Sequence, residues 1–247
     1  MGPITGEETV ATLRARLERT ERQAAARQTQ LEHYAADLRE VFKQERARAQ
    51  ELRRSYMATV GALSNAVEAR DAYTSKHAER VAAYGLELAR VAGLDVADSP
   101  QIEFGFLLHD VGKLGVPDAI LFKSGRLTEE EYALVRRHPI IGTEILRDID
   151  FLGEGKLVVR HHHERWDGTG YPDGLAGEAI PFAARVFAVA DALDALTTDR
   201  PYRPASSFSR AREVLHACAG TQFDPSVVSA YQEIPDATFE RLRAALE

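Results

Sequence analysis

The first sixty residues carry the hydrophobic pattern of one long helix. Residues 7–63 contain no proline, have no glycine before Gly61, and are rich in Ala, Arg, Glu, Gln and Leu, which favour helix. In the second half of this segment two heptad positions are mostly apolar, with Glu45 as an interruption: Ala35, Phe42, Ala49, Tyr56 and Leu63 at one, and Leu31, Leu38, Leu52 and Thr59 at the other. We expect a parallel homodimeric coiled coil that runs into a globular domain. The alternative is an amphipathic helix folded back onto that domain.

From residue 64 onward the apolar residues recur at the spacing of shorter helices, without the alternation of β-strands. Helix-boundary signals separate these segments: Gly93, the capping box of Thr128 and Glu131, and the prolines Pro139, Pro181 and Pro225, with Asp224 as an N-cap. These patterns predict an all-α protein, with a helical stalk over residues 1–63 and a domain of about seven helices over residues 64–247.

Charge and composition exclude several classes of protein. The net charge is −7; residues 1–60 contribute +2 and the remainder −9, which does not suit nonspecific binding of DNA or RNA. An anionic substrate stays compatible with the chain, because bound metal ions and a few local basic residues outweigh a diffuse negative field. No apolar run is long enough to span a membrane and no signal peptide begins the chain. The single cysteine, Cys218, is expected to pack in the core, and we predict a reducing cytoplasm.

Histidine and aspartate gather in one part of the chain, each where an apolar helix reaches a polar stretch. Imidazole and carboxylate together bind transition metals such as Fe, Mn and Zn, so the series predicts a metal-dependent hydrolase. The series is His77, His109, Asp110, His138, His162, His163 and Asp191. We expect His77 inside a helix that begins near Ser64, and Gly112 at the end of the helix that carries His109 and Asp110. His161 is the one histidine of its run that we leave out of the series.

The surrounding motifs resemble the HD-GYP family, a branch of the HD-domain phosphohydrolases. The resemblance covers nearly all of residues 68–232. It rests on these segments: Asp71–His77, His109–Lys113, Val116–Asp118, His138–Pro139, His162–Pro172, Ala190–Thr197, Asp199–Arg203 and Gly220–Pro225.

The resemblance implies an HD-type helical domain that hydrolyses cyclic di-GMP, a bacterial second messenger, to pGpG; whether a second cleavage to GMP follows is left open by the sequence. It also implies that the seven residues of the series ligate metal ions, with Asp110 bridging two of them. Fe or Mn is favoured, and Zn, Mg or Ni is compatible in vitro. Two metal ions bind the non-bridging oxygens of a phosphodiester and activate a water between them.

Four further residues are expected to meet the substrate. Lys113 follows Asp110 by three residues and places a permanent positive charge on the phosphate; the alternative is a solvated loop lysine. By resemblance, Arg200 and Arg203 contact phosphate or guanine; the alternative is surface pairing with Asp199 or Asp194. Tyr171, in a glycine-rich turn, stacks on the nucleotide or packs its own loop, and Trp166 nearby is expected in the core.

One position departs from the family pattern. Some members carry a glutamate one turn before the first histidine, where it supports a third metal, whereas this chain has Tyr73. A phenol is a poor replacement for a carboxylate at neutral pH, so we predict two metal ions. Two other functions stay open: an HD-type hydrolase of other nucleotides, including cyclic GMP-AMP, and a cyclic dinucleotide sensor or docking module without turnover. The stalk is expected to relay a signal from an upstream sensor that the sequence does not identify.

Overall fold

A single helix, α1, runs from Gly6 to Glu68 in the computed structural model, which describes residues 6–70, 76–96, 99–123, 125–199 and 203–246. The chain forms two compact units, Met1–Tyr56 and Met57–Glu247. The predicted division after residue 63 falls within α1, whose last residues, 57–68, belong to the second unit. Across the described residues, none of the helices combines the length and apolar content needed to cross a bilayer.

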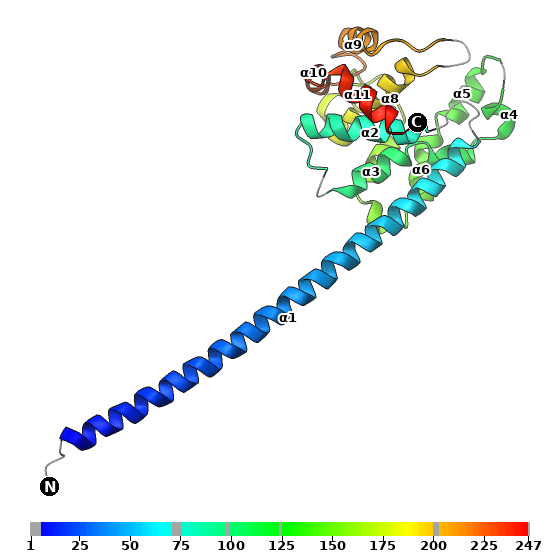
Figure 1. Ribbon diagram of the computed structural model, residues 1–247. Coiled ribbons are helices and arrows are strands. Elements are labelled where there is room, and N and C mark those ends of the chain that lie inside the picture. Colours follow the sequence, from blue (N-terminus) through cyan, green and yellow to red (C-terminus); the bar gives the residue numbers. More distant parts are fainter. Residues whose placement is uncertain (1–5, 71–75, 97–98, 124, 200–202, 247) are drawn as a thin grey trace. The chain divides into compact units, whose positions relative to one another are not determined.

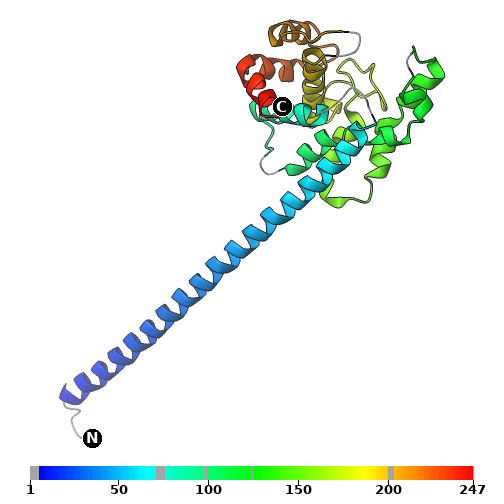
Figure 2. The same ribbon diagram turned by 45° about the vertical axis from the view of Figure 1, so that its right-hand side comes forward.

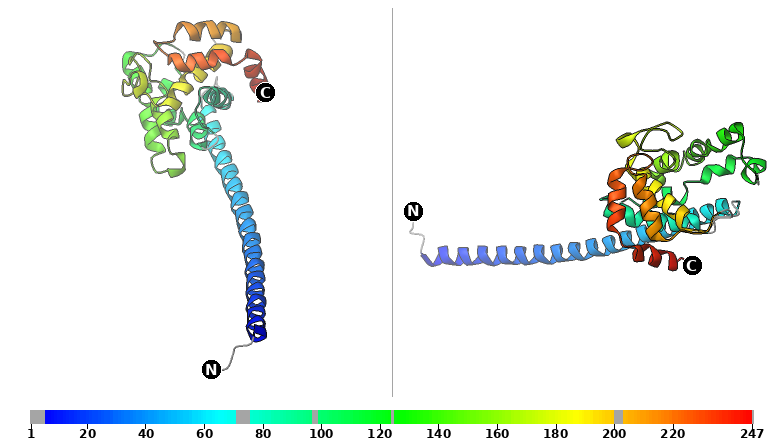
Figure 3. Two further views of the ribbon diagram at one scale, coloured as in Figure 1. Left: turned by 90° about the vertical axis from the view of Figure 1, so that its left-hand side faces the viewer. Right: turned by 90° about the horizontal axis from the view of Figure 1, so that it is seen from above.

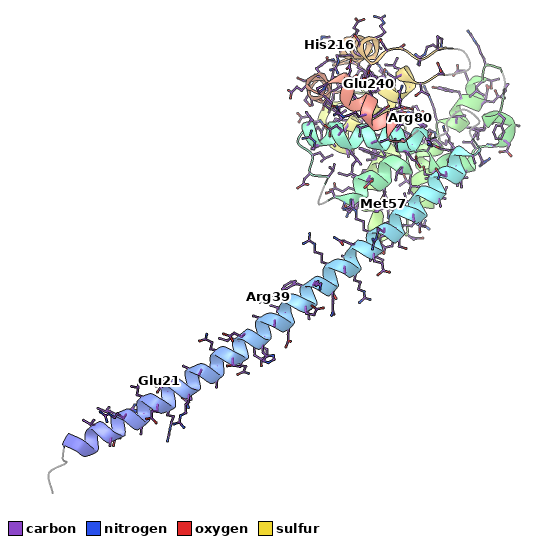
Figure 4. The ribbon with its side chains drawn as sticks, in the orientation of Figure 1. Glu21, Arg39, Met57, Arg80, His216 and Glu240 are labelled. Atoms are coloured by element: carbon purple, nitrogen blue, oxygen red, sulfur yellow. The ribbon has the colours of Figure 1, made fainter. Side chains whose placement is uncertain are left out.

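The first unit is helix throughout its described part. Every side chain from Val10 to Ser55 is exposed, including Leu31, Leu38 and Phe42 of the heptad pattern, which are 66%, 58% and 67% exposed. Figure 4 draws these side chains as sticks along the helix, with Glu21 and Arg39 labelled. A helix of this kind is not stabilised by packing within its own unit, since most helical stability in proteins comes from burying an apolar face.

The second unit is all-α, as predicted, and no strand occurs in the part of it that the structure describes (Figure 1). Its α-helices after α1 are α2 His77–Val91, α3 Pro100–Leu107, α4 Asp118–Leu121, α5 Glu129–Val135, α6 His138–Ile145, α7 Gly155–His161, α8 Phe182–Thr197, α9 Phe208–Ala217, α10 Pro225–Glu233 and α11 Asp236–Ala244. Three short 3₁₀ helices join them: η1 Val111–Gly115, η2 Asp150–Leu152 and η3 Gly177–Ala179. The helices outnumber the predicted seven because several are of four to eight residues, too short to leave a periodic pattern.

The core lies between α2 and α8, which pack against each other, and α3, α6 and α7 complete it. Tyr84 and Leu88 of α2 and Val186 and Phe187 of α8 are at most 1% exposed. Burying one such side chain stabilises the fold by about 1.5–3 kcal/mol, so these helices form a rigid base. Figures 2 and 3 show α9–α11 gathered at one end of this unit and α4 and α5 at another.

The helix boundaries confirm some signals and correct others. Thr128 and Glu131 form the capping box of α5, Asp224 caps α10 through the Ser226 amide, and Gly93 follows α2 with φ +83°. The prediction for His77 was wrong: α1 ends at Glu68, and His77 is the first residue of α2.

The prediction that Gly112 ends the helix of His109 and Asp110 was also wrong. Helix α3 ends at Leu107, and Gly112 lies within η1. A Cβ atom on Gly112 would stand 1.8 Å from the carbonyl oxygen of His138. Glycine is therefore required here for the close approach of η1 to α6, and not for ending a helix.

Candidate metal centre

Five separate elements of the second unit bring the seven predicted ligands into one region. His77 begins α2, His109 and Asp110 form the turn between α3 and η1, and His138 begins α6. His162 and His163 follow α7 directly, and Asp191 lies in α8. Each histidine therefore lies at a helix end or in a turn, where its ring can leave the packed core while its backbone stays anchored. His77, His109, His138 and His162 are buried, at 8%, 4%, 1% and 4% exposure.

Asp110 lies at the centre of this region and belongs to two groups of potential metal ligands. One group is Asp110, His138, His162 and His163, and the other is His77, His109 and Asp110; within each group the donor atoms lie within 4.8 Å of one another. Oδ1 of Asp110 faces the first group, 3.3 Å from Nε2 of His138, and Oδ2 faces the second, 3.1 Å from Nε2 of His109. One oxygen toward each group is the geometry of a bridging carboxylate.

Asp191 lies beside the second group, on the His77 side. Its Oδ1 is 3.4 Å from Nε2 of His77. The candidate ligands therefore lie in two groups: His138, His162 and His163 on one side of Asp110, and His77, His109 and Asp191 on the other. We call these the triple-histidine side and the His77 side.

Three of the buried histidines are oriented by the protein backbone in the same way. Nδ1 of His109, His138 and His162 lies 2.9, 2.8 and 2.9 Å from the carbonyl oxygen of the residue three positions earlier. A carbonyl only accepts hydrogen bonds, so in each ring Nδ1 carries the proton and donates it. The lone pair of Nε2 is then directed into the site, which is what metal ligation needs.

His77 is oriented by a carboxylate. Its Nδ1 lies 2.7 Å from Oδ2 of Asp194, whose side chain is only 2% exposed and also accepts hydrogen bonds from Arg80, the α2 residue labelled in Figure 4. Asp194 is a functional residue that the sequence-based ligand set missed. The sequence does contain a sign of this role, because Asp194 follows Asp191 by one helical turn and so lies on the same face of α8.

The electrostatic environment differs between the two sides. Burial lowers the pKa of His162 well below its ordinary value and that of His163 to about 4. Burial would also lower the pKa of His77, but the Asp194 hydrogen bond and the charge of Asp191 raise it overall. The rings of His162 and His163 are therefore neutral at pH 7, as ligands must be.

Asp110 stays ionised in this environment. Burial alone would raise its pKa, but the charge of Lys113 holds it well below its usual range. Nζ of Lys113 lies 2.8 Å from Oδ2 of Asp110, so this lysine is not a solvated loop residue. A set of imidazoles and carboxylates of this kind fits Fe, Mn or Zn.

The turn after His163 forms one wall of the site. Tyr171 stacks on His163 with ring centroids 4.7 Å apart, and the Tyr171–Pro172 peptide is cis. A Cβ atom on Gly170 would stand 2.4 Å from the amide nitrogen of Arg165, so only glycine allows this turn to fold back. The buried Glu164 accepts hydrogen bonds from the amides of Asp173 and Leu175, which fixes the far end of the turn.

Other predicted residues lie elsewhere. Arg203 is exposed and donates a hydrogen bond to the carbonyl of Ala195, and it lines a groove between α8 and α9. Arg200 and Tyr73 lie outside the described residues. Trp166, expected in the core, is only half-buried, and its ring faces the guanidinium of Arg185, with Cζ 5.8 Å from the ring centroid. Cys218 is also half-buried, because it lies at the end of α9 beside the same groove.

His161 is separated from its two neighbours, as expected. It lies with Glu164 and Asp173, and its buried Nδ1 has no hydrogen-bond partner among the described residues. Arg160 already forms a two-point ion pair with Asp173. This group is therefore a local structural cluster beside the metal centre.

Comparison with known proteins agrees with this geometry. A family model for the HD domain matches residues 61–227. The cyclic di-GMP phosphodiesterase response regulator RpfG of Xanthomonas campestris is 45% identical over 174 residues, which cover 70% of this chain and 46% of that protein. The 3′3′-cGAMP-specific phosphodiesterase 2 of Vibrio cholerae is 39% identical over 198 residues, 79% of this chain and 38% of that protein.

A solved structure supports the fold. A cyclic GMP-AMP specific phosphodiesterase of Vibrio cholerae superposes with a TM-score of 0.59 at 19% identity, over 76% of this chain and 50% of that one. The chain spans less than half the length of the curated relatives that it matches. It belongs to the HD-domain family, in the HD-GYP branch that its motifs resemble.

Proposed function

We propose that this protein is a metal-dependent phosphodiesterase that hydrolyses cyclic di-GMP to pGpG. The observation that carries the proposal is the position of Asp110, with one oxygen toward three histidines and the other toward His77 and His109. The names of relatives such as RpfG, a cyclic di-GMP phosphodiesterase, support the substrate.

The proposed ligands are the seven residues of the series, and the proposed number of metal ions is two. When bound, two metal ions supply Lewis acidity toward the phosphate and a nucleophilic water at neutral pH. The chain's own contributions follow from its geometry. Backbone carbonyls and Asp194 hold the imidazoles with their lone pairs inward, and Asp110 stays ionised between them.

Lys113 is proposed to stabilise the negative charge that develops on the phosphate during hydrolysis. It lies beside Oδ2 of Asp110, so its ammonium group is already at the centre before substrate arrives. A permanent charge placed in advance costs no reorganisation during the reaction. Tyr171 is proposed to contact the nucleotide from the wall of the site. Arg203 lines a groove that contains none of the seven proposed ligands. Its proposed contact with the substrate therefore rests on the family resemblance alone.

A second substrate deserves direct comparison, because a relative of 39% identity is specific for 3′3′-cGAMP. The metal ligands meet phosphates, which cyclic di-GMP and 3′3′-cGAMP share, so the choice between them depends on base contacts. Both substrates therefore belong in the same assay.

The experiment is anaerobic purification with metal analysis, followed by incubation with each dinucleotide and chromatography of the products. We expect linear pGpG from cyclic di-GMP. As a matched control, Asp148→Ala removes a carboxylate that is 85% exposed and should leave activity unchanged. A metal-loaded protein that binds cyclic di-GMP without cleaving it would instead be a sensor.

We also propose that the helix before the catalytic unit dimerises as a coiled coil. The support is the exposed heptad pattern of the first unit. Replacing Leu38 and Phe42 together by aspartate should convert a dimer into a monomer in light-scattering measurements, while replacing the exposed Arg39 and Lys43 by alanine should not. A wild-type chain that is monomeric at micromolar concentration would reject the coiled coil.

A further inference from the structure

A row of planar groups leads outward from the metal centre. Its first member is His163, and Tyr171 stacks on that ring. The guanidinium of Arg136 follows, with Cζ 5.2 Å from the centroid of Tyr171 and 4.6 Å from that of Tyr132. Arg136 is thus flanked by two aromatic rings at the edge of the site. Neither Arg136 nor Tyr132 belongs to the metal-ligand set or to the motifs that carry the family resemblance.

The backbone on both sides of Arg136 is fixed. Tyr132 and Arg136 lie one helical turn apart, on the same face of α5 and its C-cap, and the capping box holds the other end of that helix. Tyr171 belongs to the turn that Gly170 and Glu164 hold in place. Contact between a guanidinium and an aromatic face is favourable, so the two rings restrict the orientation of the arginine.

The hydrogen-bonding edge of Arg136 is open. A guanidinium carries five N–H donors in its own plane, and rings against its faces leave those donors pointing outward. In the described part of the chain the Arg136 side chain has no carboxylate or other hydrogen-bond acceptor. By contrast Arg80, Arg160, Arg185 and Arg212 are each paired with an aspartate. A restricted arginine with open donors, in a protein of net charge −7, is built to receive an anion.

The proposed substrate carries one phosphate that does not lie at the metal centre and is therefore available to Arg136. A cyclic dinucleotide carries two phosphates on one ring, and only one of them lies at the metal centre during a cleavage step. Lys113 is directed to that centre by its contact with Asp110. We infer that Arg136, positioned by Tyr132 and Tyr171, binds the second phosphate of the cyclic dinucleotide; this inference rests on the proposed function.

The test compares a large and a small phosphodiester on the same metal-loaded variants. Cyclic di-GMP needs both the metal centre and the Arg136 subsite, whereas bis(p-nitrophenyl) phosphate has a single phosphate and needs only the metal centre. Arg136→Met removes the charge and keeps an apolar stem between the rings. We expect KM for cyclic di-GMP to rise about ten- to hundredfold, as for the loss of a charge-assisted hydrogen bond, with kcat within about threefold.

Three controls make the result specific. Hydrolysis of bis(p-nitrophenyl) phosphate and the metal content should both stay within about twofold of wild type in Arg136→Met, since neither depends on the open donors. Arg136→Lys should recover part of the affinity for cyclic di-GMP that Arg136→Met loses, because lysine restores the positive charge but not the paired N–H donors of the guanidinium. Arg137→Met changes the neighbouring exposed arginine, which has no described ring contact, and should leave KM unchanged.

Each other result overturns the inference in a recognisable way. Equal losses on both substrates would mean that Arg136 supports the metal centre, and no loss on either would make it an ordinary surface residue. A loss with cyclic di-GMP and 3′3′-cGAMP but none with cyclic di-AMP would assign Arg136 to guanine. A wild-type chain that cleaves bis(p-nitrophenyl) phosphate but neither binds nor cleaves cyclic dinucleotides would reject the proposed function itself, and the subsite with it.

Discussion

The two sides of Asp110 differ in how one histidine is held: His109, on the His77 side, donates to a backbone carbonyl as His138 and His162 do, whereas His77 donates to a carboxylate. On the triple-histidine side, His138 and His162 donate to backbone carbonyls, and burial lowers the pKa of His162. On the His77 side, Asp194 receives the imidazole proton and is itself paired with Arg80. A carbonyl fixes the direction of a ring, whereas a carboxylate also changes its charge. The two sides should therefore respond differently to mutation and to pH, although both supply imidazole nitrogens.

The largest effect is expected from removing the residue that the two sides share. Asp110→Ala takes away the two carboxylate oxygens that face the two groups of candidate ligands, so metal binding and phosphodiesterase activity should fall together to background. Elemental analysis and product chromatography on the same preparation measure both. A variant that keeps turnover, or that loses only one of two metal ions without losing activity, would show that the two sides work independently.

Lys113→Ala should have the next largest effect. It removes the ammonium group next to Oδ2 of Asp110 but no metal ligand, so kcat should fall about a hundred- to a thousandfold with metal content unchanged. Steady-state kinetics with metal analysis separates the two. Loss of metal from this variant would reassign Lys113 to holding Asp110 in place.

Asp194→Asn tests the His77 side alone. The amide keeps the shape of the side chain and loses the charge that orients His77, and such losses typically cost about 10–100-fold in metal affinity or activity. One metal ion should be weakened more than the other in a chelator titration. Glu87→Gln is the control, since it breaks an ion pair with the exposed Arg90 within α2, away from the metal centre, and should cost less than about 0.5 kcal/mol.

The last prediction is that the pH dependence of stability has opposite signs on the two sides of the metal-free protein. The pKa of His163 is about 4 in the fold against 6.5 unfolded, so the unfolded chain binds more protons between these values and stability falls on acidification, by on the order of 3 kcal/mol in full. The pKa of His77 is raised, so its contribution is present below pH 6.5 and is lost as pH rises through the folded value.

Urea unfolding of chelated protein between pH 4.5 and 8 measures this difference. Relative to wild type, His163→Gln should become more stable as pH falls. Glutamine binds no proton in the unfolded chain, so the variant lacks the acid destabilisation that His163 causes. His77→Gln should become less stable as pH falls, because it has lost a favourable charge beside Asp194. Parallel curves for the two variants would contradict the distinction between the two sides.

The sequence was informative about the centre because motif and chemistry agree. Helical spacing predicted the all-α class, and the order of His77, His109, Asp110, His138 and Asp191 identified residues that do come together. Boundaries were harder. The sequence predicted one helix from near Ser64 through His77, whereas α1 ends at Glu68 and α2 begins at His77. Gly112 reads as a helix stop, whereas its purpose is a close approach to α6 that no local pattern reveals.

The sequence by itself determined which side chains are able to bind a metal ion and that they belong to a helical protein. The chemical type of a side chain and the periodicity that predicts a helix are both local properties of the sequence. The tertiary structure alone decided how these side chains are arranged around Asp110, which ring is held by Asp194, and that Tyr132 and Tyr171 enclose Arg136. These are relations between residues far apart in the chain. They depend on how α2 packs on α8 and how the turn after His163 folds back, and such packing is set by the whole core.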